Sequence, residues 1–165
     1  MDKIKKSYLE SNSFYQETIL GGLSCIISKK IEYIFHKRIE LVIFTFVSVI
    51  VDNVTENAIK AFSNECHKKA VNEYDGRGLS NNSGVISISI LIANKIDDSA
   101  IQYCKENSKP HWATKQIHIV YDITKDKFYF SKRWRIWGAL FYTNYQNIIK
   151  KTISELRVAF SRDHI

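Results

Sequence analysis

The sequence predicts an α/β fold in which helices cover both faces of a mixed, mostly parallel sheet. Three observations support this prediction: an apolar, β-branched run at Ile39–Val51, an amphipathic segment directly after it, and a second β-rich run at Val85–Ile92. Strands joined through a helix pair in parallel. With 165 residues, the chain has the length of one domain, so we expect residues 1–165 to form a single globular domain.

Two N-terminal segments are interpreted as helices. Ser13–Leu20 begins with a capping-box pattern and is followed by Gly21-Gly22, a common helix end. Leu23–His36 has apolar residues at helical spacing, although part of it also alternates as a strand would. A helix is expected there, and a hairpin that turns at Lys29-Lys30 is the alternative.

The middle of the chain predicts a strand, a helix and a loop. Ile39–Val51 has almost no polar residues, which is typical of a central strand covered on both faces. Thr55 can cap the helix that follows. The apolar face of this helix consists of Ile59, Phe62, Cys66, Ala70 and Tyr74. The stretch Asp75–Gly84 is rich in glycine, serine and asparagine and predicts an exposed, mobile loop.

The second half continues with further strands and helices. A strand at Val85–Ile92 precedes a helix from Asp97 to about Asn107, and Pro110 prevents that helix from continuing. Gln116–Tyr121 and Lys127–Ser131 are then expected to form a hairpin. From Gly138 onward, apolar residues at helical spacing predict a long closing helix.

The predicted element order, (α)α-β-α-β-α-β-β-α, resembles that of thioredoxin-like folds, with Pro110 before the third strand. The chain has no Cys-x-x-Cys motif, so this resemblance implies no redox activity. Cys25, Cys66 and Cys104 are widely spaced and odd in number, which favours reduced thiols and a cytoplasmic location. A nuclease-like α/β core is also compatible with this order.

Positive charge is concentrated in the C-terminal part. The chain has a formal net charge of +7 and a pI of about 9.3. From Lys127 to the end there are eight lysines and arginines but only two acidic residues, a formal charge of +6. Such a surface attracts polyanions.

The segment Lys127–Trp137 alternates cations with aromatic residues, the combination that single-stranded nucleic-acid binders use for phosphates and bases. The other interpretation is a charged edge strand that resists aggregation, with both tryptophans packed under the last helix. The candidate binding residues are Lys127, Lys132, Arg133, Trp134, Arg135 and Trp137.

These features favour a small non-enzymatic binding protein whose basic aromatic region contacts nucleic acid or an acidic protein. The longest apolar run, Leu41–Val51, is about half the ~20 residues that a membrane-spanning helix needs, so no membrane partner is expected. A structural role is an alternative, with the aromatic hairpin as the face of a homodimer.

No cofactor, metal or catalytic residue is assigned. The cysteines and histidines, Cys66-His67, Cys104, His111 and His118, lack the short paired spacings of zinc sites. A metal-dependent nuclease is the alternative function, with carboxylates of Asp52 and Asp122 at strand ends and Lys125 nearby. Aspartates in such positions more often form caps and turns.

Overall fold

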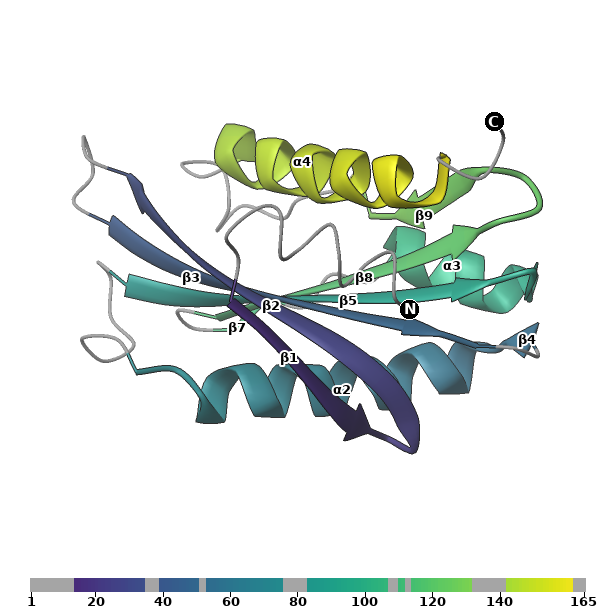
Figure 1. Cartoon of the computed structure of the whole chain (residues 1–165), viewed down its shortest axis with the longest axis horizontal. Coiled ribbons are helices and arrows are strands. Elements are labelled where there is room, and N and C mark those ends of the chain that lie inside the picture. The colour runs from purple at the N-terminus through teal and green to yellow at the C-terminus, as the bar shows by residue number, and fades with distance from the viewer. Residues whose placement is uncertain are drawn as a thin grey trace.

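The protein is described by a computed structural model that covers residues 14–34, 39–50, 53–75, 83–106, 110–111, 114–131 and 142–161 (Figure 1). The strands of its main sheet are β1 Phe14–Leu20, β2 Leu23–Ile34, β3 Ile39–Val49, β5 Ser83–Ala93, β7 Pro110–His111, β8 Thr114–Asp122 and β9 Lys127–Phe130. The sheet order is β1-β2-β3-β5-β8-β7, and β9 also pairs with β8. Two short strands, β4 Asn53–Val54 and β6 Lys95–Ile96, pair separately. The helices are α2 Glu56–Asn72, α3 Asp98–Glu106 and α4 Tyr142–Ser161.

The N-terminal helix predictions are wrong, because both segments are strands. β1 and β2 form an antiparallel hairpin that turns at Gly21-Gly22, with Leu20 opposite Leu23. Both glycines have positive φ, 57° and 79°, as a tight two-residue hairpin turn requires. The alternative turn at Lys29-Lys30 is also wrong, since β2 runs through both lysines and pairs with β3.

The sheet is mixed, as expected, but it is not mostly parallel. Among the described strands, β3–β5 and β5–β8 are parallel pairs, whereas β1–β2, β2–β3, β7–β8 and β8–β9 are antiparallel. In chain order, strands β1, β2 and β3 of the main sheet and the short strand β4 precede α2, the first described helix. This order differs from the expected thioredoxin-like order.

The central strand and the helix after it are confirmed. β3 lies between β2 and β5, and its residues 41–48 are buried. Thr55 caps α2, because its hydroxyl accepts a hydrogen bond from the Ala58 backbone N–H at 3.2 Å. The expected apolar face of α2 packs on the sheet through Ile59, Phe62, Cys66 and Ala70.

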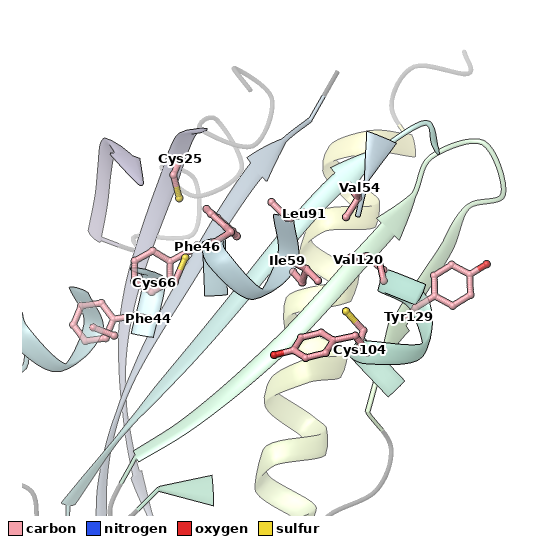
Figure 2. Close-up of a cluster of buried hydrophobic side chains, with 14 of the residues drawn as sticks. Cys25, Phe44, Phe46, Val54, Ile59, Cys66, Leu91, Cys104, Val120 and Tyr129 are labelled. Atoms are coloured by element: carbon pink, nitrogen blue, oxygen red, sulfur yellow. The ribbon is translucent and has the colours of Figure 1, made fainter. Parts of the chain in front are cut away.

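Two apolar clusters lie on alternate residues of the strands. One joins α2 and α3 to side chains such as Phe44, Leu91 and Val120 (Figure 2). The other joins Ile148, Ile149 and Leu156 of α4 to the intervening strand residues, among them Ile43, Ile90 and Ile119. Figure 1 shows α4 on one side of the sheet and α2 on the other.

The C-terminal elements also agree with the sequence. β5, α3, the β8–β9 hairpin and α4 occupy the expected segments, although α4 is described only from Tyr142. The loop prediction for Asp75–Gly84 falls mostly outside the described residues; Ser83 and Gly84 belong to β5.

Candidate binding groove between strand 9 and helix 3

The structure places only one of the sequence-predicted binding residues. Lys127 is the first residue of β9 and its side chain is exposed. Lys132, Arg133, Trp134, Arg135 and Trp137 lie outside the described residues. The site is therefore built from β9 and from the elements that contact it.

The aromatic residues of β9 pack on both faces of the sheet. Phe128 and Phe130 lie against the α4-side cluster, and the ring of Phe128 stacks on that of Tyr121 at 4.1 Å. Tyr129 points to the opposite face, where it is 8% exposed and joins the α2–α3 cluster. Figure 2 shows Tyr129 at the periphery of that cluster. Aromatic side chains of β9 therefore contribute to the core on both faces of the sheet.

Two lysines converge on the ring of Tyr129. The Nζ atom of Lys127 lies 5.3 Å from the ring centroid, and the Nζ atom of Lys105 on α3 lies 5.6 Å from it. These distances are within the range of cation–π attraction. They also place the two ammonium groups within roughly 11 Å of each other.

These two lysines differ from most other described cations because neither forms an ion pair with a described residue. Lys29 and Lys60 also lie over aromatic rings, but Asp75 and Glu56 respectively pair with them. A lysine without a carboxylate partner keeps its full charge available for an incoming anion.

A groove of about 520 Å³ opens beside these lysines. One wall is Gln102, Lys105 and Glu106 of α3, and the other is the whole of β9, Lys127–Phe130. Residues three and four apart share one face of a helix, so α3 presents a single polar face to the groove. The groove is lined by two lysines and by one carboxylate, that of Glu106, which accepts a hydrogen bond from Gln102 Nε2.

Lys105 was not predicted from the sequence. It lies on a different element from Lys127, and only the packing of α3 against β8 and β9 brings the two together. The available signal was the polar face of the Asp97–Asn107 helix, opposite Ala100, Tyr103 and Cys104, which are buried.

Of the residues proposed for a nuclease, Asp122 and Lys125 are described, and they stabilise a turn. The Asp122 carboxylate accepts hydrogen bonds from Thr124 Oγ1 at 2.6 Å and from the Lys125 backbone N–H at 3.1 Å. Lys125 Nζ lies 3.0 Å from its other oxygen. Burial raises the pKa of Asp122, but these donors outweigh it, so the pKa lies below its usual value. Asp122 thus forms the β8–β9 turn, and Asp52 lies outside the described residues.

The cysteines and histidines do not gather into a site among the described residues, where no three of the His, Cys, Asp and Glu side chains could hold one metal ion. Burial raises the pKa of the Cys25 and Cys104 thiols to about 12 and raises that of Cys66 as well. The ring of His118 packs on that of Tyr103, with centroids 5.1 Å apart. The side chain of His111 is outside the described set.

A row of buried hydroxyls under α2 was not anticipated from the sequence. Ser63 Oγ and Ser89 Oγ share a hydrogen bond of 2.7 Å, and Ser89 Oγ donates to the Ile117 carbonyl at 3.1 Å. Both serines are fully buried. Because buried polar groups need partners, these bonds tie α2 to β5 and β5 to β8.

Comparison of the sequence with protein-family models and with curated proteins, and of the fold with solved structures, finds no match. Function must therefore be argued from the groove itself. Among the described helices, none is both long and apolar enough to span a membrane.

A second groove, of about 480 Å³, lies beside the C-terminal part of α2. It is lined by Gln16, Ile27, Lys29, Ile31, Phe44 and Glu73. Its one lysine, Lys29, pairs with Asp75 at 2.8 Å, and Glu73 adds a negative charge. The groove at β9 is therefore the better candidate for an anionic ligand.

Proposed function

We propose that this protein is a non-enzymatic binding protein that holds an anionic partner, a nucleic acid or an acidic protein segment, in the groove between β9 and α3. The observation that carries the proposal is the pair Lys105 and Lys127, two cations without ion-pair partners among the described residues that share one tyrosine ring. The +6 charge of the chain from Lys127 onward supports it.

Electrostatics gives the groove its preference for anions. The groove is lined by two lysines and one carboxylate, that of Glu106. Lys105 and Lys127 are both exposed, so their attraction for an anion is screened by salt. The Tyr129 ring also keeps each lysine near the groove, and it does so without neutralising the positive charge.

The proposal is tested by fluorescence anisotropy with two labelled probes, an oligothymidylate and an oligoglutamate. We expect binding of at least one probe to weaken steeply between about 50 mM and about 200 mM salt, because bound anions release counterions. Lys105→Gln combined with Lys127→Gln should weaken that binding about tenfold and reduce its salt dependence.

Lys60→Gln is the matched control. Lys60 also lies over a tyrosine ring, that of Tyr103 at 5.2 Å, but it contacts Glu56 and does not line the groove. The control should bind as the wild type does. Equal affinity of the double variant and the wild type would rule out the groove as the site.

A further inference from the structure

The groove runs along the edge of a strand rather than over one face of the sheet. Successive side chains of a strand point to opposite faces, so a ligand resting on one face meets only alternate residues. All four residues of β9, Lys127 to Phe130, line this groove. The groove therefore follows the outer edge of β9, with α3 as its opposite wall.

Within the described residues, no strand pairs with that edge: β9 pairs with β8 alone, and no other described backbone hydrogen bond involves residues 127–130. An open strand edge is a template for another extended chain. A nucleic acid cannot satisfy such a row of N–H and C=O groups in this way.

The aromatic residues of β9 also argue against base stacking. A base needs a free ring face, but Tyr129 is 8% exposed and has two lysines over it. Phe128 stacks on Tyr121, and Arg157 lies 5.6 Å from the centroid of the same phenylalanine ring. Contacts within the protein therefore already occupy the faces of these rings.

Building on the proposed function, we infer that the anionic partner is an extended acidic peptide that adds as a strand to the open edge of β9. Its acidic residues would alternate with apolar ones. On the side of α3 they meet Lys105 and Lys127, and on the other side the apolar residues meet Phe128 and Phe130, which are only partly buried. Four residues of β9 span about 13 Å, so an extended peptide of six residues covers this edge and reaches about one residue beyond each end.

The test uses a capped, fluorescein-labelled peptide of alternating glutamate and valine, six residues long. Two further versions carry N-methyl groups on alternate backbone amides, one version on the odd residues and the other on the even residues. In an added strand, alternate N–H groups point toward the neighbouring strand. We expect one methylation pattern to weaken binding at least tenfold and the other to leave it within about twofold of the parent.

A peptide with three consecutive glutamates followed by three valines controls for composition, and it should bind more weakly than the alternating one. Equal binding of both methylated peptides, with loss on changing Lys105 and Lys127, would overturn strand addition and leave the anion-binding proposal standing. Binding of oligothymidylate but of no peptide would overturn the peptide partner. Failure of every probe at low salt would overturn both proposals.

Discussion

Lysine side chains of this protein differ according to whether a carboxylate neutralises them. Lys29, Lys30 and Lys125 form ion pairs with Asp75, Glu155 and Asp122, respectively. Lys105 and Lys127 contact only an aromatic ring among the described groups. A cation–π contact leaves the net charge unchanged. This difference between individual residues is the basis of the proposed anion site.

Asp122 provides a residue-scale prediction about the β8–β9 turn. Its carboxylate is 1% exposed and accepts from Thr124, from the Lys125 backbone and from the Lys125 ammonium group. Asp122→Ala should lower the free energy of unfolding by about 1–3 kcal/mol, because it leaves these donors without their acceptor. Urea unfolding measures the loss. Asp75→Ala removes an exposed carboxylate and should change little; an equally small effect at Asp122 would contradict its role in the turn.

Lys115 predicts a specific dependence of stability on pH. Burial lowers the pKa of Lys115 to about 8, from 10.5 in an unfolded chain. Between these values the unfolded state binds more protons, so this group makes stability rise with pH across that window. Lys115→Met should therefore be more stable than the wild type at pH 7, and its advantage should shrink as the pH rises from about 8 to about 10.5.

The measurement is urea unfolding of both proteins at a series of pH values. Taking the difference between them cancels the titration of other groups, including the buried thiols. Lys68, which is 69% exposed, provides the control for replacing a lysine with methionine outside the core. A Lys115→Met difference that stays constant with pH would mean that the Lys115 amine titrates normally in the folded protein.

The β1–β2 hairpin shows what an element needs beyond its local sequence. Gly21-Gly22 is compatible with both a helix end and a tight hairpin turn, and the local pattern around it favoured helices. The pairing of β2 with β3 along Ile26–Ile34 decides between them. The strand-like alternation in part of Leu23–His36 was a local signal for this pairing, but the helical spacing of the same segment competed with it. The helix α2, in contrast, was predicted because its cap and apolar face are local.

Two substitutions test the turn at the scale of the hairpin. Gly21 and Gly22 have φ values of 57° and 79°, and nothing lies within 4 Å of a Cβ added at either position. The cost of a substitution is therefore conformational. Gly22→Val should destabilise the protein by about 1–2 kcal/mol, whereas Gly21→Asn should be nearly neutral because asparagine tolerates this conformation. Thermal unfolding compares the stabilities of the two variants. A similar loss of stability in both would indicate that something other than backbone conformation is involved.

At the scale of the whole molecule, the sequence predicted the α/β class, the mixed sheet and the longer elements from Ile39 onward, where hydrophobic periodicity is strong, but not the two-residue strands β4, β6 and β7. Of the two lysines in the groove, the sequence analysis singled out only Lys127, because it belongs to a run of neighbouring cations and aromatic residues. Lys105 could not be predicted in this way because its proximity to Tyr129 depends on how α3 packs. Sites assembled from distant segments are visible only once the fold is known.

The central claim, that the groove between β9 and α3 binds an anionic partner, is tested most directly by backbone amide NMR. A nitrogen-15-labelled sample is titrated at low salt with unlabelled oligoglutamate, and the amide shifts are followed along the chain. We predict that the largest changes fall on Gln102, Lys105, Glu106 and residues 127–130. Changes centred on Lys29 and the second groove, or no saturable change anywhere, would contradict the claim.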